Sequence, residues 1–292
     1  MKNDAKKELI AEVLGIFLLL FGMHWVAYFI RKFTYIALIA SLEESAPALY
    51  SILRYFGHLV FLAGFFVVAY FFKEYRPHLI GAITKLKPSK AVLTFIIGLA
   101  VGCLLNSICV LAAKLNGDIT IEGNTDFNIG LLIFAFIAVF IQSTTEELES
   151  RGMVFGKMAE VVPTWAAAVI SAVFFSAIHL LNDGITWISV ITIITIGIAY
   201  ALAYYYTGSI YLPAGMHTAW NFTQDFIFGL PNSGNPSAMS ILKSTALSDS
   251  WAYSTEFGVE GGYTAIAVNV VLIVVIVLAL ARRKQEAVSR QQ

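Results

Sequence analysis

The sequence has little charge and almost no cysteine. Only 13% of its 292 residues are charged, against about 25% in soluble domains, so an ordinary soluble fold is excluded. The 19 basic and 19 acidic residues balance, which does not indicate a nucleic-acid partner. Cys103 and Cys109 lie on roughly opposite sides of one apolar segment, so we expect neither a disulfide nor a metal pair. The rest is apolar, with 58% hydrophobic residues and a mean hydropathy of +0.76, which indicates an integral membrane protein.

Long apolar runs predict the architecture. A membrane-spanning helix needs ~20 mostly apolar residues, and about eight runs qualify. We therefore expect an all-α, polytopic membrane helical bundle that forms one membrane domain over 1–292, with an exposed extracytoplasmic loop at 229–261. The first run could continue to residue 41. The expected spans are 9–30, 47–72, 91–113, 128–157, 163–181, 185–204, 209–228 and 262–281.

The distribution of charge predicts the orientation. Most lysines and arginines fall in the segments that are cytoplasmic if the N-terminus is cytoplasmic, as the positive-inside rule requires. The opposite loops are acidic, as at 43–44 and 118–126. We therefore expect a multi-pass protein of the cell membrane, in contact with membrane lipids and with both termini cytoplasmic. Arg31 and Lys32 disagree, because they lie near the outer end of the first span unless that helix runs on.

A few polar residues stand inside or beside the apolar runs. An ionisable side chain near a bilayer centre costs at least ~2.5–3.5 kcal/mol, so it marks a functional site by default. Counted from the expected cytoplasmic helix ends at ~1.5 Å per residue, Glu146, His179, His217 and Asn221 fall in one layer near the midplane. The pattern thus predicts a polar cavity within the membrane. The polar residues of these runs are Glu146, Glu147, Arg151, His179, His217 and Asn221.

Their spacing suggests separate roles. Glu147 and Arg151 are four apart and face each other on a helix, so we expect them to neutralise one another as supporting residues. Glu146 projects about 100° away and is free for another partner. His217 and Asn221 are also four apart and can address one ligand. His24, His58 and His78 have no such context, and we expect them to be structural or interfacial.

Three short motifs resemble those of one known family. Glu146 to Gly152 reads EELESRG, which resembles the EExxxRG motif of the CPBP family. That family includes type II CAAX prenyl endopeptidases and bacterial Abi, or bacteriocin-processing, proteins. Phe175 to His179 is similar to its FxxxH motif, and His217 to Asn221 is similar to its HxxxN motif. The resemblance covers about 130–225, and the three motifs occur in order on separate apolar segments.

The resemblance implies an intramembrane endopeptidase. It acts on a peptide or lipid-modified peptide, of CAAX type or of bacteriocin or leader type. The family's roles imply that Glu146 carries the catalytic water with help from His179, while His217 and Asn221 stabilise the oxyanion. Glu149 departs from the family, which often has a bulky apolar residue before the arginine. This third carboxylate could alter substrate preference.

The residues leave the metal question open. Glu146, His179 and His217 supply the ligand types of many catalytic zinc sites, but no HExxH sequence is present. We expect metal-independent chemistry that needs no cofactor, because a base and oxyanion donors suffice. Zinc remains the alternative. Two other functions also remain open: a non-catalytic bacteriocin-immunity protein on the same fold, and a proton-coupled membrane transporter, since intramembrane acids and histidines also form proton relays.

Overall fold

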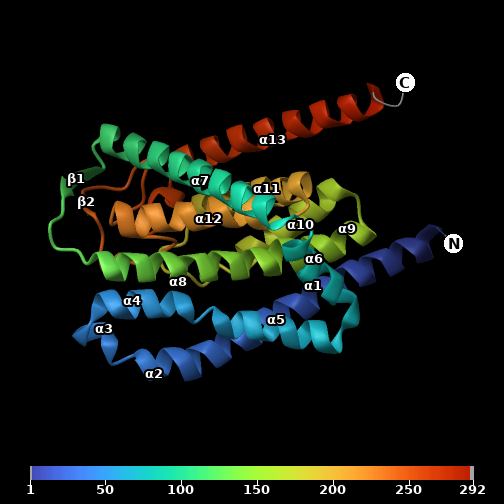
Figure 1. The fold of residues 1–292 in the computed structure, drawn as a ribbon, viewed down its shortest axis with the longest axis horizontal. Coiled ribbons are helices and arrows are strands. Elements are labelled where there is room, and N and C mark those ends of the chain that lie inside the picture. Colours follow the sequence, from blue (N-terminus) through green and yellow to red (C-terminus); the bar gives the residue numbers. More distant parts are fainter. Residues whose placement is uncertain (1, 290–292) are drawn as a thin grey trace.

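The computed structural model describes residues 2–289, with side chains from Lys6 onward, and is almost wholly helical (Figure 1). A small antiparallel sheet of two strands lies at one end of the bundle. In chain order the elements are α1 (Lys2–Arg31), η1 (Lys32–Ile36), α2 (Ala37–Ile39), α3 (Leu42–Ser45), α4 (Pro47–Phe56), α5 (Leu59–Phe71), η2 (Lys73–Tyr75), α6 (Arg76–Thr84), α7 (Pro88–Asn116), β1 (Ile119–Gly123), α8 (Ile129–Glu147), η3 (Leu148–Phe155), α9 (Gly156–Val161), α10 (Thr164–Ala177), α11 (Trp187–Thr207), α12 (Tyr211–Phe222), η4 (Thr223–Ile227), β2 (Leu242–Ala246), η5 (Val259–Gly261) and α13 (Tyr263–Ser289).

Six helical segments of the described chain are long and apolar enough to cross a membrane, which makes this a multi-pass membrane protein. The prediction of about eight spans is therefore not met. The expected span 163–181 forms α10, which has 14 residues and is ~21 Å long, less than a ~30 Å hydrocarbon core. The expected span 209–228 forms α12, which has 12 residues, and the short η4. The six segments are Lys6–Ile39, Pro47–Phe71, Pro88–Asn116, Ile129–Val161, Trp187–Thr207 and Tyr263–Ser289.

The first span continues beyond residue 30. It runs through the π-helix η1 and ends with α2 at Ile39, so Arg31 and Lys32 lie inside it rather than at its end. Both ends of the described chain lie at the same end of the bundle, opposite β1 and β2 (Figure 1). This arrangement agrees with an even number of spans. The cytoplasmic location of that end stays a prediction.

Segment 229–261 is only in part the exposed loop that its composition predicts. Its strand β2 pairs with β1, from Ile119 opposite Ala246 to Gly123 opposite Leu242. Leu230, Tyr253 and Val259 of this segment are almost fully buried and pack against α7 and α12, whereas Leu247 and Trp251 are exposed. Apolar residues scattered among glycines and serines do not show a helical or strand period, which is why this burial was not predicted.

Local sequence explains where the site-bearing helices begin and end. Asn128 caps α8 by accepting a hydrogen bond from the Leu131 N–H at 3.0 Å, as N-cap residues do. Thr186 and Ser189 form a reciprocal capping box at the start of α11. Gly208 ends α11 with φ 70°, a conformation that glycine adopts without steric cost. These signals fix the helices on either side of the polar residues.

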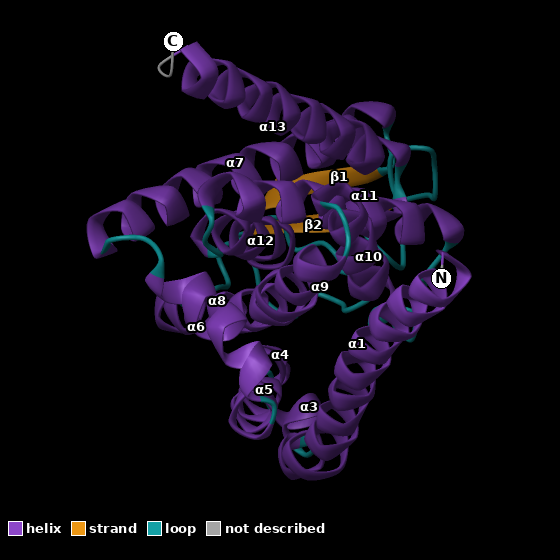
Figure 2. Ribbon diagram, turned by 90° about the vertical axis from the view of Figure 1, so that its right-hand side faces the viewer, coloured by secondary structure: helices purple, strands orange, loops and turns teal. Residues whose placement is uncertain are grey.

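The element α12 lies near the centre of the helices, with α13 on one side and the α1–α5 pair on the other (Figure 2). It packs closely on α7, because a side chain at Gly102 would collide with the Met216 backbone and one at Gly215 with the Phe95 carbonyl. Small residues allow such close helix packing in membranes. The central position of α12 brings His217 and Asn221 into the middle of the bundle.

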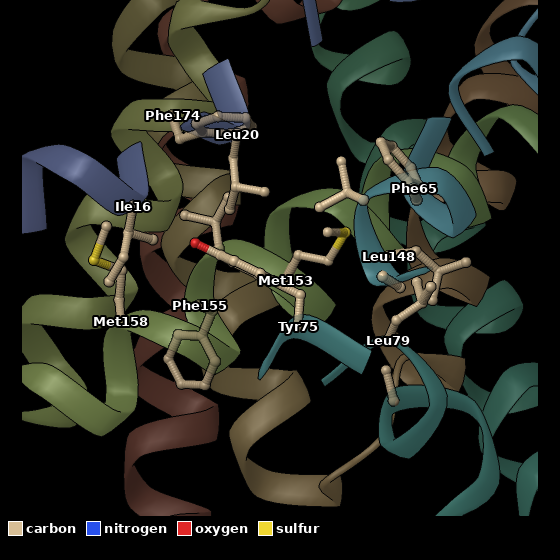
Figure 3. Packing of buried hydrophobic residues seen from close by; sticks show 14 of the residues in the cluster. Ile16, Leu20, Phe65, Tyr75, Leu79, Leu148, Met153, Phe155, Met158 and Phe174 are labelled. Carbon is tan, nitrogen blue, oxygen red and sulfur yellow. The ribbon is translucent and has the colours of Figure 1, made fainter. Parts of the chain in front are cut away.

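The largest apolar cluster holds η3 against the N-terminal helices (Figure 3). Met153 and Leu148 of η3 are buried in contact with side chains from α1, α5 and α6. This packing fixes the segment that directly follows Glu146 and Glu147. The labelled members of the cluster are Ile16, Leu20, Phe65, Tyr75, Leu79, Leu148, Met153, Phe155, Met158 and Phe174.

Candidate active site

Four of the predicted site residues line one cavity of about 460 Å³. Glu146 lies in the last turn of α8, and His179 lies in the turn that follows α10. His217 and Asn221 lie one turn apart on α12. Glu146, His217 and Asn221 are all buried, with 6–8% of their surface exposed. The fold thus brings together side chains from three segments that are distant in the sequence.

Glu146 sits among three imidazoles. Its Oε1 lies 3.3 Å from His58 Nε2 and accepts a hydrogen bond from Gln142 Nε2. Its Oε2 lies 3.9 Å from His179 Nε2 and 3.7 Å from His217 Nε2. These two distances exceed a hydrogen bond, and Oε2 has no hydrogen-bond partner among the described residues. One carboxylate oxygen is therefore held in place, while the other faces two ring nitrogens with nothing bonded to it.

Glu147 and Arg151 lie behind the cavity wall and support it. Both side chains are fully buried, and Arg151 Nη1 donates to Glu147 Oε1 at 2.9 Å. The guanidinium also lies over the rings of Phe175 and Tyr200, with 4.3 Å and 5.2 Å to their centroids. The same Glu147 oxygen lies 3.0 Å from His217 Nδ1. Glu147 therefore neutralises Arg151 and orients a cavity histidine at once.

Hydrogen-bond partners assign the protons on two cavity histidines. His179 Nδ1 lies 2.7 Å from the Phe175 carbonyl, which can only accept, so Nδ1 carries the proton. In neutral His179 the Nε2 lone pair then faces Glu146. His217 Nδ1 likewise donates to the ionised Glu147 carboxylate, so His217 Nε2 can donate only in the imidazolium form. His179 Nε2 can thus accept a proton, and His217 Nε2 can donate to an anion once the ring carries a second proton.

His58 contacts Glu146 directly. Its Nδ1 lies 3.0 Å from the Tyr55 carbonyl, and its Nε2 lies 3.3 Å from Glu146 Oε1. Both neighbouring atoms are acceptors when Glu146 is ionised, so both ring nitrogens find partners only if a second proton is present. That proton resides either on the His58 Nε2 atom or on Glu146. The proton can therefore move between His58 and Glu146 without a change in the charge of the pair.

His58 belongs to none of the three motifs, and it was expected to be structural or interfacial. It lies at the junction of α4 and α5 and is 88 residues away from Glu146 in the chain. The other two histidines without motif context differ from it. His24 contacts the buried Glu149 at 3.0 Å, and His78 contacts Glu160 at 3.0 Å on a half-exposed surface. Glu149 itself does not line the cavity, so its expected influence on substrate preference has no direct contact to carry it.

No metal site is formed by the arrangement. Among the residues that the structure describes, no three histidine, cysteine, aspartate or glutamate side chains are arranged to hold a metal ion. Glu146, His179 and His217 are the nearest to such a set, but the carboxylate oxygen is 3.7–3.9 Å from the two ring nitrogens. Two ligands at ~2.0–2.1 Å from one tetrahedral zinc ion would lie closer together than this. Glu146, His179 and His217 would therefore have to draw together to hold zinc.

The fold and the cavity define a class of protein: a multi-pass helical membrane protein with a buried carboxylate that is surrounded by histidine side chains. Residues 128–223 match the family model described as Rce1-like, type II CAAX prenyl endopeptidase. This confirms the resemblance seen in the motifs, and the match contains all three of them. No curated protein and no solved structure matched the chain. Residues before 128 lie outside the match, and they include His24 and His58 of the cavity wall.

Replacing His58 tests whether Glu146 needs its proton partner. We expect His58→Ala to lower kcat for peptide cleavage by about 10²-fold, the lower end of the contribution of a general acid or base. The measurement is initial cleavage rate by the purified protein in liposomes. His78→Ala, which removes an imidazole that does not line the cavity, is the control and should leave kcat unchanged. An unchanged kcat in a folded His58→Ala protein would show that the contact is structural.

Proposed function

We propose that the protein is an intramembrane endopeptidase that hydrolyses a peptide bond of a CAAX-type or leader-type substrate. The observation that carries the proposal is the position of Glu146 Oε2. This buried carboxylate oxygen has no hydrogen-bond partner among the described residues, and it faces two imidazole nitrogens in the cavity. The match of residues 128–223 to type II CAAX prenyl endopeptidases supports the same reaction.

The reaction begins with one water beside Glu146. Two atoms 3.9 Å apart, Glu146 Oε2 and His179 Nε2, can both accept from a water about 2.8 Å from each. Glu146 removes one proton as the oxygen attacks the peptide carbonyl, which is general base catalysis. His179 orients the water through its Nε2 lone pair. His58 and Glu146 together then return a proton to the amine that leaves, so the site regains its starting protonation.

The oxyanion is stabilised from α12. His217 in its charged form donates from Nε2, while its Nδ1 is held by Glu147. Asn221 Nδ2 donates one proton to Gln142 Oε1 at 3.1 Å, which fixes the amide and leaves its second N–H for the oxyanion. Removing one such donor typically costs ~2.7–4 kcal/mol of transition-state stabilisation. Glu147, itself held by Arg151, keeps His217 in position.

The proposed mechanism routes no step through a metal. We expect cleavage to persist after prolonged dialysis against a chelator, with metal content measured in parallel on the same sample. Loss of cleavage on dialysis and recovery on adding Zn²⁺ would instead assign Glu146, His179 and His217 to a metal that draws them together.

The direct test compares cleavage by the wild type and Glu146→Ala, both reconstituted in liposomes. The substrates are a prenylated CAAX peptide and an unprenylated leader-type peptide. We expect the wild type alone to cut, and the substrate that it cuts identifies the substrate class. Equal cleavage by both proteins would remove Glu146 as the base. Proton-dependent solute flux without cleavage would indicate a transporter, and cellular protection against a bacteriocin that survives Glu146→Ala would indicate immunity by binding.

A further inference from the structure

Two polar side chains on the cavity wall carry atoms that have no hydrogen-bond partner. Thr192 of α11 and Asn269 of α13 both line the cavity that contains Glu146. They are almost fully buried, with 2% and 0% of their surface exposed. Thr192 Oγ1 and Asn269 Oδ1 nevertheless have no partner among the described residues. Buried polar groups are nearly always hydrogen-bonded, so these two atoms point to a ligand that enters the cavity.

The contacts of Asn269 fix the direction of its amide. Its Nδ2 donates to the Thr192 carbonyl and to Thr195 Oγ1, both at 3.2 Å. The carbonyl can only accept, and the Thr195 hydroxyl already donates to that same carbonyl at 2.9 Å. The amide nitrogen therefore belongs on this side, and the oxygen is the free atom. Asn269 thus offers the cavity an acceptor and no donor.

The two free atoms complement one neutral group. They belong to neighbouring residues, because the Asn269 amide is bonded to the Thr192 backbone. The Thr192 hydroxyl can donate or accept, whereas Asn269 Oδ1 can only accept. A hydroxyl that donates to Asn269 and accepts from Thr192 satisfies both atoms, and so does a carboxamide through its N–H and its carbonyl. An aliphatic side chain would leave both atoms without a bond.

Neighbouring residues of the cavity wall do not supply the missing bonds. Ile193 and Ile196, the next residues of α11 that line the cavity, are apolar. Glu260 belongs to η5, which packs on both α11 and α13. Its oxygens already accept three hydrogen bonds, from Trp220 and Ser233. The group that bonds to the two free atoms therefore has to come from another molecule.

The place of Thr192 on α11 limits what this molecule is. Tyr200, on the same helix, packs on the His217 ring with 5.7 Å between the ring centroids. Thr192 precedes Tyr200 by two helical turns, ~12 Å along the axis. An extended peptide advances ~3.3–3.6 Å per residue. A peptide bound with its scissile bond beside His217 can therefore present to Thr192 the side chain of a residue about three to four positions away.

We propose that Thr192 and Asn269 form a specificity subsite for a substrate side chain that carries a hydroxyl or a carboxamide, within about four residues of the cut. This inference rests on the proposed endopeptidase function. Asn269 belongs to α13, which lies outside the residues 128–223 that match the family model. The subsite therefore adds a substrate preference to the reaction that the three motifs carry out.

Peptides that differ in one side chain test the subsite without cleavage. The probes are a sixteen-residue alanine peptide with a lysine at each end and one central threonine, and the same peptide with valine, which has nearly the shape of threonine but no hydroxyl. A second pair carries glutamine or methionine at that position. All four are titrated by calorimetry into purified Glu146→Gln protein in a neutral detergent. We expect the threonine and glutamine peptides each to bind about 10-fold more tightly than their matches, because the apolar side chain leaves two buried atoms unpaired. Equal affinities in both pairs, or no measurable binding of any peptide at 1 mM, would overturn the subsite.

Single substitutions in the Glu146→Gln background locate the preference. Thr192→Val removes a hydroxyl that has no partner in the described structure, so the unfolding midpoint should hold while the threonine-to-valine ratio falls to within about two-fold. Asn269→Leu should reduce the ratio as well. Thr264→Val is the matched control and should keep the full ratio, because this α13 hydroxyl also lacks a partner among the described residues but does not line the cavity. An unchanged ratio in Thr192→Val, or an equal loss in Thr264→Val, would refute the assignment.

Two readouts separate this inference from its alternatives. If the two side chains only hold α11 against α13, their variants will lower the unfolding midpoint and leave the ratio unchanged, which would overturn the subsite. Cleavage of the threonine peptide by the wild type, mapped by mass spectrometry, should fall within about four residues of the threonine, and a cut farther away would contradict the placement. A preference for threonine in binding without any cleavage would contradict the endopeptidase function and leave the subsite standing.

Discussion

Glu146→Gln is expected to lower kcat for peptide cleavage by about 10³- to 10⁴-fold while the protein stays folded. The amide keeps the shape of the side chain but cannot take a proton from water, and a positioned base contributes ~10²–10⁴-fold. Glu146 Oε2 has no hydrogen bond to lose in the described structure, so little stability depends on it. Cleavage rate and thermal midpoint should be measured on the same preparation.

Glu149→Gln is the matched control for this loss of activity. Glu149 is also buried and also contacts a histidine, His24. Unlike Glu146, Glu149 does not line the cavity. We expect its cleavage rate to stay within a few-fold of the wild type. A Glu146→Gln protein that cleaves at the wild-type rate would remove the proposed base, and one that unfolds would show that the carboxylate has a structural role instead.

Glu147→Leu is expected to destabilise the protein by about 3–5 kcal/mol, the cost of leaving one partner of a buried ion pair alone. Arg151 is fully buried and its guanidinium has no other carboxylate within 4 Å among the described residues. His217 would lose its Nδ1 partner at the same time. We therefore expect low expression, a lower unfolding midpoint and loss of cleavage together.

A second substitution separates stability from catalysis. In Glu147→Leu with Arg151→Met, both charges are replaced by apolar side chains, a change that is often neutral in buried pairs. The unfolding midpoint should recover, whereas cleavage should not, because His217 still lacks Glu147. Glu160→Leu, which removes a half-exposed partner of Lys157, should change the midpoint little, as surface substitutions do. Full stability of the Glu147→Leu single variant would contradict the role of the pair.

The sequence predicted which residues of the three motifs would meet at one cavity. Glu146, His179, His217 and Asn221 stand at helical spacing in apolar surroundings, where polar side chains are costly, and the fold places all four at one cavity. His58 could not be found in this way. It belongs to none of the motifs, and its importance comes from a contact between helices that no local spacing records.

The membrane architecture was predicted only in outline. Hydropathy identified the apolar segments, but it does not distinguish a helix that crosses the bilayer from a shorter helix buried inside the bundle. That is why α10 and α12 were expected to be full spans, although α10 has only 14 residues and α12 only 12. Segment 229–261 was in part misjudged for a related reason, since its buried apolar residues follow no regular period.

Cleavage in water enriched in ¹⁸O tests most directly whether this cavity hydrolyses peptides. The wild type and Glu146→Gln, each in liposomes, are incubated with the same peptide, and the masses of the products are measured by mass spectrometry. The wild type should introduce one ¹⁸O atom into the new C-terminal carboxylate in a single turnover, while Glu146→Gln leaves the peptide intact. Labelled product at the same rate from both proteins, or intact peptide from both, would contradict a water activated by Glu146.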